Sequence, residues 1–256
     1  LASAACTLGA QAAGPEIGTL MERARDLFDY GRWSDARHEF LRAKAALTPS
    51  DRLLAQEVEF YLAACAVELG SADAEGALRE FDERYPGSVY ANDVRFALGS
   101  FYCSAGNMKK AREAFEKTDY RALSAPRREQ YDIRMGYVEF GDGNYAKAYG
   151  YFDRIGRSEY VDHARYYKAY IDYAEGRYGR AKQGFETLAR SDAYGDVVPY
   201  YLLQIEFREG NYRYVVENGE ALARRAVPER RAELERVMAE SWFRLEDFNK
   251  TLEHLA

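Results

Sequence analysis

The feature that most constrains this chain of 256 residues is a ten-residue pattern that recurs along most of it. From Gly143 it reads GNYAKAYGYF: a glycine, an aromatic residue two positions later, an alanine after three more and a phenylalanine after four more. Clear or weaker copies begin at Gly31, Gly70, Gly106, Gly143, Gly176, Gly210 and Glu246. Successive starts lie 39, 36, 37, 33, 34 and 36 residues apart. A period of this size indicates stacked supersecondary units.

Each position in the pattern has a physical role that predicts a pair of helices. Glycine can adopt the left-handed conformation that ends one helix and turns the chain into the next. The aromatic residue would fill the corner between the helices, and the alanine and phenylalanine would share one helical face. Seven residues before each start stands a mostly small residue, which allows two helices to approach closely. This small series is Ala24, Ala63, Gly99, Gly136, Ala169 and Ala239, with Leu203 as the exception.

The pattern resembles the tetratricopeptide repeat, a helix-turn-helix unit of about 34 residues, and the resemblance covers roughly residues 17–256. It implies an all-α protein, a right-handed α-solenoid of about seven helical hairpins over residues 15–256. Glu246 departs from it by replacing the glycine, and the first interval is long. Because the chain stops inside the last repeat, we expect residues 15–256 to be the N-terminal part of a longer array.

The repeat positions also predict where the helices lie. The expected ranges are 17–30, 33–47, 51–69, 73–84, 89–105, 107–118, 125–141, 144–155, 159–175, 177–190, 195–209, 211–225, 229–245 and 247–256.

The segment FDERYPGSVYANDVRFALGSFYCSAGNMKKAREAF carries a finer resemblance. It is similar to repeats of bacterial cell-envelope proteins, among them the lipoprotein of the outer-membrane β-barrel assembly machinery and the periplasmic repeat partner of the Tol-Pal system. It implies an exported protein, either periplasmic or associated with the outer membrane.

Residues 1–14 differ from the rest of the chain because they carry no charge and are mostly small or apolar. They are typical of the end of an export signal, with cleavage after Ala12 or Ala13. A second interpretation makes Cys6 the lipidated residue of a lipoprotein, and a third is a disordered alanine-rich terminus. No other apolar stretch has the roughly 18–20 residues that a membrane-spanning helix needs.

Composition limits the partners that such a protein can have. The chain is 47% hydrophobic and 30% charged, with a formal net charge of −6, as in a soluble globular protein. It lacks the basic stripe that binds nucleic acid phosphates. We therefore expect a protein or peptide segment as partner, no nucleic acid and no membrane insertion beyond a lipid at Cys6.

The resemblance places the side chains ten, six and three residues before each repeat start on the concave face of the solenoid. In the central repeats these are mainly aromatic, and aromatic rings are typical anchors for partners. The alternative is that the rings only pack between neighbouring helices. The predicted partner-binding groove comprises Phe96, Ile133, Tyr137, Phe140, Tyr166, Tyr170, Tyr173, Tyr200, Gln204 and Phe207.

The chemistry-bearing residues predict neither catalysis nor a cofactor or metal site. His38, His163 and His254 lie far apart in the sequence, none at a metal-ligand spacing from a cysteine. Cys65 and Cys103 are expected as two free, partly buried thiols. The groove also lacks the lysine, asparagine and arginine of the repeats that clamp chaperone carboxylates. The sequence thus predicts a non-catalytic protein-interaction scaffold of the bacterial cell envelope, with a glycan or small-ligand binder as the alternative.

Overall fold

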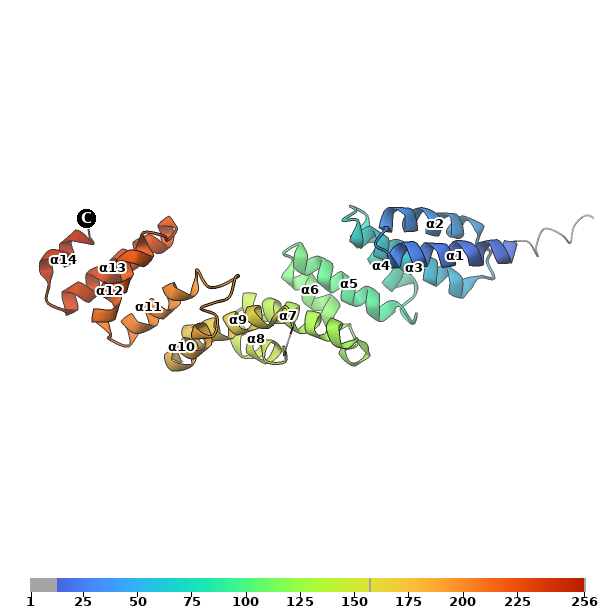
Figure 1. Cartoon of the computed structure of the whole chain (residues 1–256). Coiled ribbons are helices and arrows are strands. Elements are labelled where there is room, and N and C mark those ends of the chain that lie inside the picture. Colours follow the sequence, from blue (N-terminus) through green and yellow to red (C-terminus); the bar gives the residue numbers. More distant parts are fainter. Residues whose placement is uncertain (1–12, 157, 256) are drawn as a thin grey trace, which may run out of the picture. The chain divides into compact units, whose positions relative to one another are not determined.

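The structure is a computed structural model that describes residues 13–156 and 158–255. Within these ranges the chain contains α-helices joined by turns, one short 3-10 helix and no strand (Figure 1). The predictions for Cys6 and for most of the terminal segment fall on residues outside these ranges. The chain divides into two compact units, Leu1–Gly141 and Asp142–Ala256.

The first unit holds three helical hairpins followed by α7. Its elements are α1 (Ala13–Asp29), α2 (Trp33–Ala46), α3 (Arg52–Glu68), α4 (Ala74–Arg84), α5 (Ala91–Ser104), α6 (Met108–Glu116), η1 (Tyr120–Ala122) and α7 (Ala125–Gly141). The two helices of each hairpin pack on each other, and the second helix also packs on the next hairpin.

The second unit begins with α8 and continues with three hairpins that stack in the same order. Its elements are α8 (Tyr145–Phe152), α9 (Val161–Ala174), α10 (Tyr178–Glu186), α11 (Val198–Arg208), α12 (Tyr212–Ala223), α13 (Pro228–Arg244) and α14 (Phe248–Glu253). The fourteen predicted α-helices are therefore confirmed in the described residues. The 3-10 helix was not predicted, and α10 ends at Glu186, four residues earlier than expected.

The repeat glycines form the turns as predicted. The six glycines that start a repeat have φ between 60° and 83°, and Glu246 takes the same conformation with φ of 63°. After Gly106 the N–H of Asn107 donates to the carbonyl of Tyr102 over 2.8 Å, which closes the end of α5. Asp247 donates in the same way to Trp242 over 3.0 Å. Glu246 is therefore a true repeat start.

Replacing Gly106 with alanine should lower the free energy of unfolding by about 1 kcal/mol. A Cβ there would meet nothing within 4 Å, so no steric clash contributes to the loss. The cost comes from the backbone, because alanine rarely adopts the φ of 73° found at this position. The matched control is Gly76→Ala, because Gly76 lies exposed in α4 with equally open surroundings. That change should raise the stability by about 0.5–1 kcal/mol. Urea unfolding followed by circular dichroism checks both, and equal effects of one sign would contradict the turn assignment.

Most of the repeats contribute a buried phenylalanine to the core. Phe40, Phe115, Phe152 and Phe185, together with Phe81 of the irregular repeat, are among the largest fully buried side chains. The small series makes room for these rings. A Cβ added to Gly99 would lie 2.5 Å from the ring of Phe115. The predicted close approach of the two helices is confirmed at this point.

In the α11–α12 hairpin the first helix has the large residue of this contact and the second helix has the small one. Leu203, the exception in the small series, stands where other hairpins have alanine or glycine, and Gly219 stands where most other repeats have phenylalanine. A Cβ on Gly219 would lie 3.8 Å from Leu203 Cδ1 and 2.5 Å from Met238 Sδ of α13. Leu203 and Met238 are both buried and fill the place of the missing ring.

Candidate functional site

The second unit gathers tyrosines from α9 and α11 into one contiguous set of rings. Tyr166 and Tyr170 lie one turn apart on α9, and both contact Tyr201 of α11 with ring centroids 6.0 and 5.7 Å apart. Tyr173 contacts the same ring at 5.7 Å, and Tyr200 lies beside it at 5.2 Å. All five side chains are partly exposed. We call Tyr166, Tyr170, Tyr173, Tyr200 and Tyr201 the aromatic face.

Part of this face is used to hold neighbouring hairpins together. Tyr166 stacks on Tyr194 with centroids 4.3 Å apart and an interplanar angle of 14°. Its hydroxyl donates to the Tyr201 hydroxyl over 3.2 Å. The Tyr194 hydroxyl in turn lies 2.6 Å from His163 Nδ1. Packing between hairpins thus fixes the rings, while their partial exposure leaves an aromatic surface.

The residue that organises the face was not predicted. Tyr201 stacks flat on Phe185 of the preceding hairpin, with centroids 4.8 Å apart and an angle of 4°. Phe40 with Tyr61, and Phe152 with Tyr167, make similar stacks at 4.8 and 5.3 Å. Each of these tyrosines lies nine residues before a repeat glycine. A search at that offset would have found the series.

The other predicted groove residues differ in how much of each residue is exposed to solvent. Gln204 and Phe207 follow Tyr200 along α11; Gln204 is 2% exposed, and Phe207 is partly exposed against Tyr212. In the first unit, Phe96 and Ile133 are 7% and 3% exposed. Their side chains are covered by the chain itself.

Two further predicted residues, Tyr137 and Phe140, belong to α7 of the first unit and are partly exposed. The structure thus brings the second-unit tyrosines together in one surface, and the other four predicted residues, Phe96, Ile133, Tyr137 and Phe140, belong to helices α5 and α7 of the first unit.

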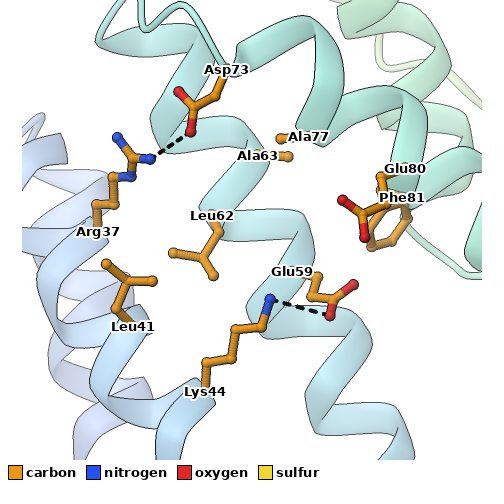
Figure 2. A pocket seen from close by; sticks show the side chains of 10 residues that line it. All are labelled: Arg37, Leu41, Lys44, Glu59, Leu62, Ala63, Asp73, Ala77, Glu80 and Phe81. Atoms are coloured by element: carbon orange, nitrogen blue, oxygen red, sulfur yellow. Dashed lines mark hydrogen bonds and ion pairs between the residues drawn. The ribbon is translucent and has the colours of Figure 1, made fainter.

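A hollow of about 160 Å³ in the first unit lies between α2, α3 and α4 and is lined by two basic and three acidic side chains (Figure 2). Arg37 pairs with Asp73 at 2.6 Å, and Lys44 pairs with Glu59 at 3.4 Å. Glu59 also accepts from Arg84 at 2.9 Å, outside the hollow. The charged side chains of the hollow are paired with one another or with Arg84, which contacts both Glu59 and Glu80, so the hollow offers little to a charged ligand.

Comparison with known proteins identifies the fold. No model of a known protein family matches the sequence, and no curated protein matches it. Among solved structures, a tetratricopeptide repeat protein from Parabacteroides merdae is similar with a TM-score of 0.56 and 16% identity over 94% of this chain and 91% of that one. The chain has the tetratricopeptide repeat fold. Pseudomonas aeruginosa PilF is similar with a TM-score of 0.51 and 16% identity over 81% of this chain and 90% of that one.

The described part of this tetratricopeptide solenoid has no group of three or more histidine, cysteine or acidic side chains arranged to hold a metal ion. Nor does any of its described helices combine the length and apolar character needed to cross a membrane. Cys65 and Cys103 are free thiols, as predicted, and burial raises the pKa of Cys65 to about 11.

Burial also sets the acid-base behaviour of the aromatic face. It raises the pKa of Tyr194 to about 12 and also raises the pKa of Tyr166 and Tyr201 above the ordinary value. In the unfolded chain these phenols ionise near pH 10. The packed tyrosines therefore stay protonated to higher pH than exposed ones.

We expect alkaline pH to unfold the second unit together with tyrosine ionisation. Because the folded-state pKa values are raised, the stabilisation is complete below about pH 10 and is lost as pH rises through about 12. Parallel titrations of tyrosinate absorbance and helical circular dichroism check this. In Tyr201→Phe, which retains the ring but cannot ionise, the loss of helix should move to higher pH. Ionisation of all the tyrosines near pH 10 with unchanged helicity would contradict the burial of these phenols.

Proposed function

We propose that this protein is a non-catalytic scaffold of the bacterial cell envelope that binds an extended segment or a helix of another protein on its aromatic face. The observation that carries the proposal is the continuous set of partly exposed tyrosine rings along α9 and α11. Such rings bury large areas at a small cost in side-chain entropy and add hydroxyls for hydrogen bonding.

The rigidity of the face supports this use. Tyr166 is held by its stack on Tyr194 and by the hydrogen bond from its hydroxyl to that of Tyr201. Tyr201 is held by its stack on Phe185. A partner therefore meets rings whose positions are already fixed, which lowers the entropy cost of binding. A helix or an extended chain could lie along the two helices, in the way that amphipathic segments enter grooves.

The envelope location rests on the sequence alone. The uncharged segment of residues 1–14 is typical of an export signal, and the segment from Phe81 to Phe115 resembles envelope repeat proteins. Placement in the periplasm or at the outer membrane follows from these two features together.

A variant that adds charge to the face tests the binding. Tyr170→Arg combined with Tyr173→Arg keeps long side chains on α9 but places two cations where a partner's apolar surface would dock. The matched control is Tyr30→Arg, because Tyr30 is 84% exposed and belongs to the first unit. We expect a protein captured from envelope extracts, identified and rebound in purified form, to lose about tenfold or more in affinity for the double variant only.

The same variants separate the scaffold from a glycan binder. Glycan mixtures are titrated against the wild type and both variants, with circular dichroism confirming the helical fold of each. Binding of purified partner that fails only in the double variant supports the scaffold. If no protein partner is found, and glycans bind the wild type but not the double variant, the scaffold proposal would be overturned.

A further inference from the structure

A hollow of the second unit lies on the α11–α12 hairpin and extends to the start of α13. It has a volume of about 750 Å³ and is rimmed by the loop before α11, including Ala193, Gly195 and Asp196. Its walls are mainly apolar and aromatic. They include Tyr200, Leu202, Leu203, Tyr214, Leu222 and Leu234. We call this hollow the α11–α13 cleft.

The cleft lies where the repeat loses its aromatic filling. In three other places the phenylalanine of one hairpin stacks on a tyrosine of the next. Here Gly219 stands in place of the phenylalanine, and Val237, nine residues before Glu246, stands in place of the tyrosine. Leu203 and Met238 refill only the centre of the hairpin. Gly219 and Val237 are themselves buried and lie on α12 and α13, the helices that border the cleft.

The charged residues of the cleft leave one excess positive charge. Arg225 and Arg230 line it together with a single carboxylate, Asp196. The Arg230 guanidinium lies 5.5 Å from the centre of the Tyr200 ring. Among the described residues, neither arginine forms an ion pair with a carboxylate, whereas Arg236 of the same helix α13 pairs with Glu233 at 2.8 Å. Both guanidinium groups are exposed and available to an anion.

We infer that the α11–α13 cleft binds a small anionic amphiphile, namely an apolar chain or ring system that carries one carboxylate. The volume is within the range of roughly 300–1,000 Å³ of small-ligand sites, which combine apolar walls with a few polar groups. The leucines contact the apolar part, and Arg225 or Arg230 binds the carboxylate through charge-assisted hydrogen bonds. This site is distinct from the aromatic face and shares only Tyr200 with it.

Calorimetric titration of the whole chain with decanoate and with decanol, as the uncharged counterpart, tests the inference. We expect saturable binding of one decanoate and about tenfold weaker binding of decanol, because a hydrogen-bonded charge contributes about one order of magnitude. The double variant Arg225→Gln, Arg230→Gln should weaken decanoate binding by about tenfold and leave decanol binding unchanged. Asp196→Asn should strengthen decanoate binding.

Two further variants locate the site. Arg224→Gln is the matched control, since Arg224 is an exposed arginine next to Arg225 on the chain and does not line the cleft. It should leave decanoate binding unchanged. Ala221→Trp should fill the cleft and abolish binding of both compounds while circular dichroism still shows a helical protein. Absence of saturable decanoate binding, equal affinity for decanol, or equal losses in Arg224→Gln and the double variant would each overturn the inference.

Discussion

Replacing Phe185 with alanine should destabilise the second unit by about 3–5 kcal/mol, the usual range for deleting a fully buried phenylalanine ring. The side chain is 0% exposed, and its ring stacks on Tyr201 at 4.8 Å and contacts Tyr166 at 6.1 Å. Its loss leaves a cavity between two hairpins and also releases the ring that organises the aromatic face. Urea unfolding and hydrogen exchange of α9–α11 measure the effect.

Phe243→Ala is the control for this experiment. Phe243 is in the same unit but is 54% exposed, so its truncation should change stability by about 0.5 kcal/mol or less. Similar losses in both variants would show that the repeat phenylalanines do not form the core between hairpins.

Gly99→Ala should lower the free energy of unfolding of the first unit by about 1–3 kcal/mol, although alanine favours helices more than glycine does. The reason is steric, because the new Cβ would lie 2.5 Å from two carbons of the Phe115 ring. That ring is itself fixed against Tyr131, at a centroid distance of 5.1 Å. Neither Phe115 nor Tyr131 can move without opening the core. Urea unfolding of the variant measures the loss.

A double-mutant cycle separates this clash from a general effect of alanine. Phe115→Leu removes part of the ring, so the cost of Gly99→Ala should shrink by about 1 kcal/mol in that background. Gly219→Ala is the comparison, because its Cβ would meet the flexible side chain of Met238. It should cost less than Gly99→Ala. Full additivity at Gly99 and Phe115 would contradict direct contact between the two positions.

The fold could be predicted because its signals are local and repeated. A glycine with positive φ, an alanine five residues later and a phenylalanine nine residues later determine one hairpin, and their recurrence determined the helix order. Glu246 was also predicted correctly as a repeat start, because the residues around it match the pattern although the glycine is missing. The early end of α10 was missed because the loop before Val198 is held by contacts distant in sequence, such as the stack of Tyr194 on Tyr166.

The site could be predicted only in part, because exposure depends on neighbours that a single helix does not reveal. The offsets from the glycine located Tyr166, Tyr170 and Tyr173, but they did not show that Gln204 and Ile133 are covered. Tyr201 was missed because it lies nine residues before Gly210, an offset that the resemblance does not place on the concave face. The α11–α13 cleft was missed although Leu203, which lines it, interrupts the repeat in the sequence.

The most direct test of the proposed function is photo-crosslinking from the aromatic face in the cells that make the protein. A photoreactive phenylalanine analogue replaces Tyr173 in one sample and the exposed Tyr30 in another, and the crosslinked products are identified by mass spectrometry. The account predicts a defined adduct with one envelope protein from position 173 and none from position 30. Identical adducts from both positions, or no protein adduct from position 173 in a folded variant, would contradict it.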